Sequence, residues 1–222
     1  SNLKKVYYKG TASDWSKISI DFNNSDLTSA TLYYYNNSSV VSTDLSAFYY
    51  VEKNSQITIT GLKDKSLTEI VIPDNVTAIG ERAFEHCDSL TSIEIGDSLT
   101  SIGLDAFAFC FNLTSITVDI YNTAYKSIDG NLYSKGGKTL IQYAIGKTAT
   151  SFTIPDSVTS IGMGAFAYCS SLTSVEIPNS VTSIGNWAFA YCRSLTSVVI
   201  GDSVTSIGEG AFENCYSLTS IT

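Results

Sequence analysis

The chain has 222 residues, of which 44% are hydrophobic and 15% charged, with a net charge of −8 and a mean hydropathy of +0.11. This length can bury a substantial core, and this composition excludes an intrinsically disordered chain. The acidic balance argues against a nucleic-acid or anionic-lipid partner, because both require a basic face. No apolar run approaches the ~18–20 residues of a membrane span, so no membrane insertion is expected.

The N-terminal quarter differs from the rest of the chain. Residues 1–35 are expected to form a small α+β cap or junction, followed by a linker over 36–56. The first ten residues lack the apolar stretch of a signal peptide, so any targeting signal or anchor is expected outside this fragment.

From residue 57 to residue 222 the sequence repeats. One set of Ile-Gly dipeptides keeps a common phase, at positions 79, 102, 161, 184 and 207, with a step of 23 residues except once, where it is 59. An Ala-Phe pair keeps the same spacing, and so do all five cysteines: Cys87, Cys110, Cys169, Cys192 and Cys215. A unit of 23 residues cannot bury its own apolar side chains, whereas stacked units bury them in continuous columns. The repeat therefore predicts a solenoid.

Each unit divides into extended and turn segments. The run Leu90–Ile95 alternates small or polar residues with β-branched ones, which is typical of a strand. In other repeats each of the three prolines of the chain directly follows the equivalent run and is expected to end the strand. A second short extended piece comes next, then a glycine suited to a turn with positive φ, and then one helical turn at Ala-Phe-x-x-Cys. Seven such strands predict one parallel stack roughly 30 Å tall, at ~4.8 Å per strand.

One unit, 113–148, is 13 residues longer than its neighbours and lacks Ala-Phe-x-x-Cys. Two strand-like runs flank Gly136–Gly137, which predicts a β-hairpin. We expect this hairpin to protrude and to be locally basic, with the following side chains exposed: Tyr121, Tyr125, Tyr133, Lys135, Lys138 and Tyr143.

The pattern Leu-x-x-Ile-x-Ile-Pro-x-Ser-Val-Thr-x-Ile-Gly-x-x-Ala-Phe-x-x-Cys resembles the BspA-like (Treponema-type) leucine-rich repeat of bacterial surface proteins. Residues 125–134 resemble the hairpin coil that interrupts such arrays, and residues 6–18 resemble a segment that closes one. The resemblance implies a right-handed leucine-rich-repeat superhelix with short strands and short helical turns. It also implies a fragment of a longer multi-array chain, an extracellular or cell-surface location, and adhesion or protein binding without catalysis.

The cysteines and the single histidine offer no catalytic or metal site. Five thiols cannot all pair, no Cys-x-x-Cys is present, and equivalent positions in a stack point the same way. A column of buried free thiols is favoured over disulfides, metal or redox chemistry. His86 occupies a variable slot and is expected to be a partly exposed surface residue. No nucleophile, carboxylate-pair or phosphate-loop motif occurs, so neither an enzyme nor a cofactor is expected.

Recognition is expected in slots that vary while the frame stays constant. The outward strand positions carry small hydroxyls and a few carboxylates, and a solvated face is the simplest interpretation there. The turn side and the hairpin carry the residue types that dominate protein interfaces. The candidate partner-binding residues are Trp187, Tyr191, Arg193, Tyr168, Phe109, Tyr133, Lys135, Lys138, Glu94 and Glu176.

Three functions fit these observations. The first is a surface module that binds a protein, either a host or matrix component or one on a neighbouring cell. The second is a structural spacer that presents another domain, and the third is a glycan-binding accessory module that uses exposed tyrosines. The tyrosine runs Tyr7–Tyr8, Tyr33–Tyr35 and Tyr49–Tyr50 are expected to cover the open end of the solenoid.

Overall fold

The computed structural model describes residues 5–9, 31–35 and 44–222. The chain forms two compact units, Ser1–Ser42 and Thr43–Thr222. In the first unit, β1 (Lys5–Lys9) pairs in parallel with β2 (Thr31–Tyr35). The rest of the expected cap, and the expected linker as far as residue 43, lie outside the described residues. In the described ranges, no helix has the length and apolar character needed to span a membrane.

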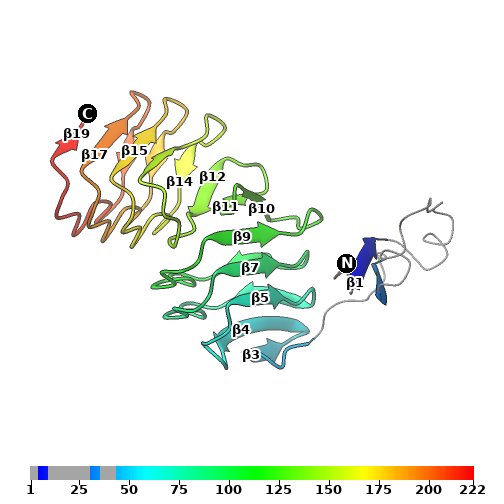
Figure 1. Cartoon of the computed structure of the whole chain (residues 1–222). Coiled ribbons are helices and arrows are strands. Elements are labelled where there is room, and N and C mark those ends of the chain that lie inside the picture. Colours follow the sequence, from blue (N-terminus) through cyan, green and yellow to red (C-terminus); the bar gives the residue numbers. More distant parts are fainter. Residues whose placement is uncertain (1–4, 10–30, 36–43) are drawn as a thin grey trace, which may run out of the picture. The chain divides into compact units, whose positions relative to one another are not determined.

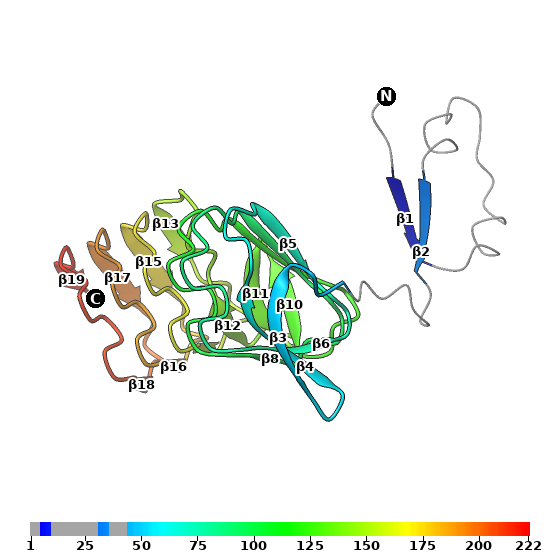
Figure 2. The same ribbon diagram turned by 90° about the horizontal axis from the view of Figure 1, so that it is seen from below.

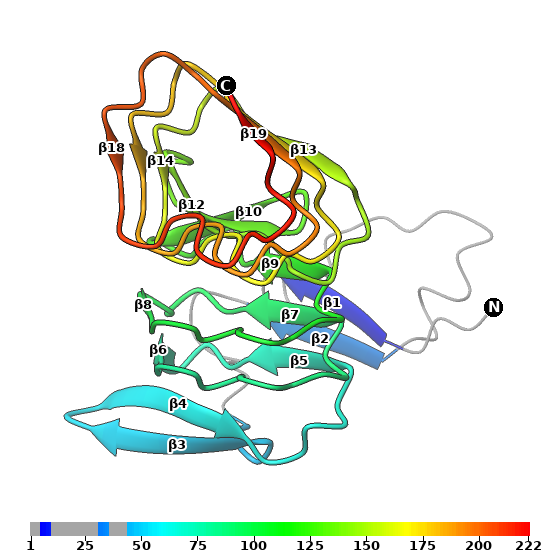
Figure 3. The ribbon, with the colours of Figure 1, turned by 90° about the vertical axis from the view of Figure 1, so that its left-hand side faces the viewer.

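The second unit is a β-solenoid in which two strands recur in each repeat (Figure 1, Figure 2). The first-strand column contains β5 (Glu69–Ile72), β7 (Ser92–Ile95), β9 (Ser115–Val118), β13 (Ser151–Thr153), β15 (Ser174–Ile177), β17 (Ser197–Ile200) and β19 (Ser220–Ile221). The second-strand column contains β6 (Val76–Ile79), β8 (Ser101–Ile102), β14 (Ser160–Ile161), β16 (Ser183–Ile184) and β18 (Ser206–Ile207). Figure 3 looks along the C-terminal half, where the two columns form separate sides of each coil. The predicted solenoid is confirmed.

Neighbouring repeats pair in parallel, with a shift of 23 residues. Ser174 lies opposite Ser197, and Val175 lies opposite Val198. Threonine hydroxyls add to this pairing: the Thr196 Oγ1 donates to the carbonyl of Thr173 at 2.9 Å, one repeat earlier. Equivalent hydroxyl bonds follow both strand columns, which gives the high serine and threonine content a structural role that the sequence analysis missed.

The first-strand column is not one stack of seven strands. It divides into the sheets β5-β7-β9 and β13-β15-β17-β19, and the direction of the stack changes between them (Figure 1). The enlarged coil 113–148 causes the break. The backbone of this coil lies along the edge of β9 that would otherwise pair with the next strand. There the Ile116 N–H donates to the carbonyl of Gly130 at 2.9 Å.

The enlarged coil forms a wall of the solenoid and does not protrude. β10 (Tyr125–Ile128), β11 (Asn131–Ser134) and β12 (Thr139–Gln142) form an antiparallel sheet, and the other edge of β12 pairs in parallel with β14. The predicted turn at Gly136–Gly137 is present. A second tight turn at Asp129–Gly130 has φ values of 49° and 71°, as a type I′ turn requires. Tyr133 and Tyr143 are each only 1% exposed, so their predicted exposure is wrong.

The segments that carry Ala-Phe-x-x-Cys are successive turns, and the predicted helical turn is absent from the described residues. Each segment contains residues in the left-handed region, such as Asp105 with φ of 53° and Phe109 with φ of 60°, which a helix cannot accommodate. The preceding glycine serves close approach between coils rather than positive φ. A Cβ on Gly103 would lie 2.4 Å from the backbone nitrogen of Glu81 in the previous coil.

The expected linker also differs from the structure at its C-terminal end. β3 (Phe48–Lys53) pairs antiparallel with β4 (Gln56–Leu62), which continues into β6 and β8. Phe48 is buried against Phe84, with ring centroids 6.3 Å apart, because it covers the end of the phenylalanine column. Tyr49 and Tyr50 were expected in that role but are 58% and 45% exposed. The side chains of the earlier tyrosine runs lie outside the described part.

Aromatic rings stack along the centre of the core. Phe166 and Phe189 lie 4.7 Å apart, and Phe189 and Phe212 lie 5.1 Å apart, with nearly parallel rings. Tyr143 fills the phenylalanine position of the enlarged coil, 5.2 Å from Phe166. This column ends at Tyr143. A second stacked pair, Phe84 with Phe107, lies in the N-terminal half of the solenoid.

Replacing Phe189 with alanine should lower the free energy of unfolding by ~3–5 kcal/mol, because a fully buried ring between two others leaves a cavity. Chemical denaturation followed by circular dichroism measures this change. Phe111→Ala is the matched control, because that ring is 47% exposed, and it should cost much less. Equal stability of Phe189→Ala and the unmodified chain would contradict the inward column.

Candidate functional site

The turn side of the solenoid is built from five segments, 80–87, 103–110, 162–169, 185–192 and 208–215, which we call the turn segments. Where two turn segments are adjacent, three backbone N–H groups of one donate to three carbonyls of the next. Trp187, Phe189 and Tyr191 donate in this way to Glu209, Ala211 and Glu213, at 2.8–2.9 Å. The same three bonds join 80–87 to 103–110 and 162–169 to 185–192.

One step of this ladder is missing. Between the turn segments 103–110 and 162–169 lies the enlarged coil, which has no turn segment of its own. It supplies one bond to the ladder, from the Tyr143 N–H to the carbonyl of Ala165 at 2.8 Å. The space left open is a cavity of about 220 Å³, which we call the turn-side groove. Its walls are Ile102–Ala108 on one side and Met163, Gly164, Ala167 and Tyr168 on the other, over a floor of Ile141, Gln142 and Ile145.

A column of rings runs along the turn side past this groove. It consists of His86, Phe109, Tyr168 and Tyr191, all in the slot before the cysteine and all with positive φ. Ring centroids are 4.4 Å apart for His86 and Phe109, 4.3 Å for Phe109 and Tyr168, and 4.9 Å for Tyr168 and Tyr191. The Phe109–Tyr168 contact spans the enlarged coil, so the column continues where the backbone ladder does not. His86 is exposed in this column, as expected.

The structure brings some of the candidate binding residues together and separates others. Phe109, Tyr168 and Tyr191 are half-buried neighbours in the ring column. Trp187 and Arg193 lie on the same coil as Tyr191, Arg193 being exposed and the Trp187 indole covering Gly210 of the next coil.

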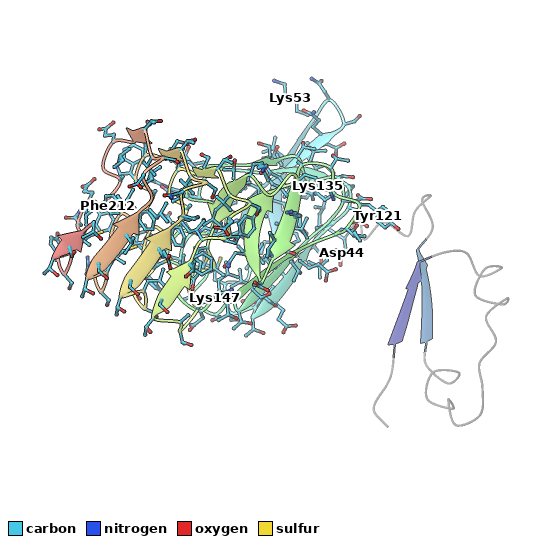
Figure 4. The ribbon with its side chains drawn as sticks, turned by 90° about the horizontal axis from the view of Figure 1, so that it is seen from above. Asp44, Lys53, Tyr121, Lys135, Lys147 and Phe212 are labelled. Carbon is cyan, nitrogen blue, oxygen red and sulfur yellow. The ribbon has the colours of Figure 1, made fainter. Side chains whose placement is uncertain are left out.

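The remaining candidates lie elsewhere. Glu94 in β7 and Glu176 in β15 are exposed on the first-strand column, in different sheets. Lys135 and Lys138 are exposed in the β11–β12 turn, and the Lys135 ammonium donates to the carbonyl of Ile120 at 2.8 Å, beside Tyr121 (Figure 4). Tyr133 is buried because the hairpin forms part of the core, so it is unavailable to a partner.

The sequence analysis did not identify the acidic edge of the groove. Asp105 lies there with its Oδ2 3.8 Å from the Nε of Arg82, which also lies 3.8 Å from a carboxylate oxygen of Glu85. The pKa of Asp105 is raised above its usual value, chiefly by burial. The Arg82 guanidinium opposes this shift, and the carboxylates of Glu85 and Glu81 add to it. The region therefore holds three carboxylates around one guanidinium, and desolvation makes a cationic neighbour favourable.

Another missed residue, Asn122, holds the enlarged coil in position. Its buried amide nitrogen donates to the carbonyls of Gly96 and Leu99, and its oxygen accepts from the N–H groups of Ala124 and Tyr125. One side chain thereby satisfies four backbone groups at the point where the repeat changes length. The only sequence signal was an asparagine four residues after the end of β9.

The cysteines form the predicted column of free thiols. Four are buried and Cys215 is half-buried, and none is in a disulfide. The Sγ atoms of Cys110, Cys192 and Cys215 each donate to a phenylalanine carbonyl of the preceding coil at 3.0 Å. Hydrogen bonding to the neighbouring thiol, together with burial, raises the pKa of each of these three thiols. No metal-ligating cluster of His, Cys, Asp and Glu occurs among the described residues.

A bulky maleimide should leave Cys87, Cys110, Cys169 and Cys192 unmodified in the native chain at pH 8, because all four are buried and the raised pKa values of Cys110 and Cys192 disfavour their thiolates. Mass spectrometry with and without denaturant measures the modification. Cys215 should react first because it is half-buried. Rapid native modification of two or more of the other four would contradict the buried column.

Stability should fall as the pH rises above about 9. The folded-state pKa of Tyr133 and of Tyr143 is raised to about 12, chiefly by burial, and the three thiols shift in the same direction. The unfolded chain therefore ionises first, so the stabilisation is complete below about pH 9 and is lost as the pH approaches 12. Urea denaturation between pH 7 and pH 11 measures this. A flat profile would contradict it.

Comparison with known proteins agrees with the architecture. The pattern of the BspA type leucine rich repeat region matches this chain in six copies, over residues 61–141 and 138–222. No curated protein sequence matches the chain. Among solved structures, the pneumococcal vaccine antigen PcpA is 21% identical, with a TM-score of 0.54, over 70% of this chain and 50% of that one. It shows the shared fold.

Two further structures are similar in sequence. The T. pallidum leucine rich repeat protein TpLRR is 27% identical, with a TM-score of 0.41, over 81% of this chain and 70% of that one. A leucine rich cell surface protein from Faecalibacterium prausnitzii is 29% identical, with a TM-score of 0.49, over 70% of this chain and 59% of that one. This chain thus spans 50–59% of the length of two of the three. Because the repeat pattern covers well over half of its residues, the chain belongs to the BspA-type leucine-rich repeat family.

Proposed function

We propose that this chain is a non-catalytic module of an extracellular or cell-surface protein and that it binds another protein through its turn side. The observation that carries the proposal is the turn-side groove with its adjoining ring column. Together they give a concave feature and half-buried aromatic side chains on a frame stabilised by inter-coil hydrogen bonds. Aromatic and arginine side chains provide most of the energy at protein interfaces, and Tyr191, Trp187 and Arg193 continue the surface next to the groove.

The strand face is a weaker candidate. Its outward positions are mostly serine and threonine, and the threonine hydroxyls one position away already bond within the array. Glu94 and Glu176 add charge but no apolar anchor. A surface of this kind offers a partner little area to desolvate.

The alternative functions are distinguished by the same features. A spacer that binds nothing is favoured by the continuous threonine and backbone ladders, which stiffen each half of the array. A glycan site is less favoured. Sugars stack on ring faces, but both faces of Phe109 and Tyr168 are covered by neighbouring rings.

Two matched double variants test the proposal. Tyr191→Ala with Arg193→Ala alters the turn side, and Glu94→Ala with Glu176→Ala alters the strand face. Each is compared with the unmodified chain for binding to immobilised extracellular-matrix proteins and to a glycan array at physiological salt. We expect saturable protein binding that the turn-side pair weakens at least tenfold, because hot-spot side chains are lost.

Thermal melting of both variants provides the control for folding. Loss of binding only in the strand-face pair would reject the turn side while retaining protein binding. Saturable sugar binding would favour the glycan function. No binding to either panel would favour the spacer.

A further inference from the structure

The turn-side groove also indicates what kind of partner segment it accepts. We propose that it binds an extended peptide segment of a partner protein. The peptide backbone supplies hydrogen bonds that the enlarged coil leaves unmade in this ladder step, and the peptide carries a basic residue beside a small or medium apolar one. This inference rests on the proposed protein-binding function and specifies its site.

One wall of the groove presents backbone donors. In the turn segment 80–87, the N–H groups of Arg82, Phe84 and His86 donate to the next segment. The equivalent groups in 103–110 belong to Asp105, Phe107 and Phe109, and within residues 44–222 the structure gives none of them an acceptor. Phe107 is almost fully buried. Asp105 and Phe107 line the groove, whereas Phe109 lies beyond its lining. A buried N–H without an acceptor is costly, so the Phe107 N–H, with that of Asp105 on the same wall, favours incoming oxygens.

The opposite wall presents backbone acceptors. The carbonyls of Leu104, Ala106 and Ala108 accept from the preceding turn segment. Their equivalents in 162–169 are Met163, Ala165 and Ala167, and only Ala165 accepts a backbone bond, from Tyr143, within the described solenoid. The groove therefore has donors on one side and acceptors on the other. A peptide chain carries both kinds of group at every residue, whereas an anion or a cation would match only one wall.

The size and lining of the groove favour side chains over a small-molecule ligand. Its volume of about 220 Å³ is below the ~300–1,000 Å³ of small-molecule and cofactor sites. Ile141 and Ile145 form the floor, and Ala108 and Ala167 line the walls. This apolar space suits one small or medium side chain of a bound segment.

Charge determines the neighbouring residue of the peptide. Asp105 lines the groove, and Glu81 and Glu85 act on it electrostatically against the single guanidinium of Arg82. The whole chain carries a net charge of −8. A lysine or arginine beside the apolar residue would offset this local excess of carboxylates.

A groove-filling variant tests the site. Ala167→Trp places a large side chain in the groove, at a slot that carries Glu85 and Glu213 in other repeats and so accepts long side chains. Glu213→Trp is the matched control, because it makes the same residue at the same slot of a repeat without the groove. Met163→Trp provides a second filling variant, since Met163 lines the groove and is 48% exposed. All three variants are checked by thermal melting.

The probe is a phage-displayed library of random nonapeptides selected on the unmodified chain. Enriched peptides are then synthesised and titrated by fluorescence anisotropy. We expect peptides with a basic residue beside an apolar one, with affinity reduced at least tenfold by Ala167→Trp and Met163→Trp and unchanged by Glu213→Trp. Methylation of backbone nitrogens in the peptide should reduce affinity at the positions that face Met163 and Ala167.

Amide hydrogen exchange measured by NMR gives an independent readout. The amides of Asp105, Phe107 and Phe109 should exchange faster than those of Arg82, Phe84 and His86, and the bound peptide should slow them. Failure to enrich any peptide, or equal binding to the filled variants, would overturn the inference. A protein partner that binds Ala167→Trp as tightly as the unmodified chain would exclude the groove as the binding site, while the proposed protein-binding function would still hold.

Discussion

The whole second unit depends on hydrogen bonds between each coil and the preceding coil, which in the regular repeats lies 23 residues earlier in the chain. Backbone groups, threonine hydroxyls and cysteine thiols all act between coils: Thr196 donates to Thr173, and Cys192 donates to Phe166. A glycine such as Gly103 is needed because the previous coil passes too close for a Cβ. A fixed spacing then gives every repeated side chain the same environment, and so phenylalanines and cysteines occur in columns.

The exception to this spacing produces the candidate site. Where the enlarged coil replaces a turn segment with hairpins, the strand sheets stop at β9 and resume at β13. The same replacement leaves the turn ladder incomplete and opens the groove. Asn122 and Tyr143 accommodate the change, one by satisfying backbone groups and the other by filling the phenylalanine position. A regular array would present no such cavity.

Sequence periodicity was sufficient to predict the strands, the inward phenylalanines, the free thiols and the location of the irregular coil. It was insufficient wherever the outcome depends on contacts between coils. Tyr133 is polar enough to suggest exposure, but its ring packs inside because β11 closes a wall of the solenoid. Phe109 and Tyr168 adopt left-handed backbone geometry, as do the residues of the same slot in the other repeats, and aromatic residues give no sequence signal for this geometry. The groove was missed because it is defined by backbone groups, which leave no compositional signal.

The break between the two strand sheets has a mechanical consequence. A parallel stack resists bending because every coil is bonded along both strand columns, but at the enlarged coil the seven-strand column is divided into sheets of three and four. The array therefore consists of two stiff halves joined at the enlarged coil. The hairpin strands and the Asn122 hydrogen bonds determine the angle between the halves. Under tension along the chain we expect strain to concentrate at the enlarged coil, so that pulling would change the width of the groove before either half of the solenoid unfolds.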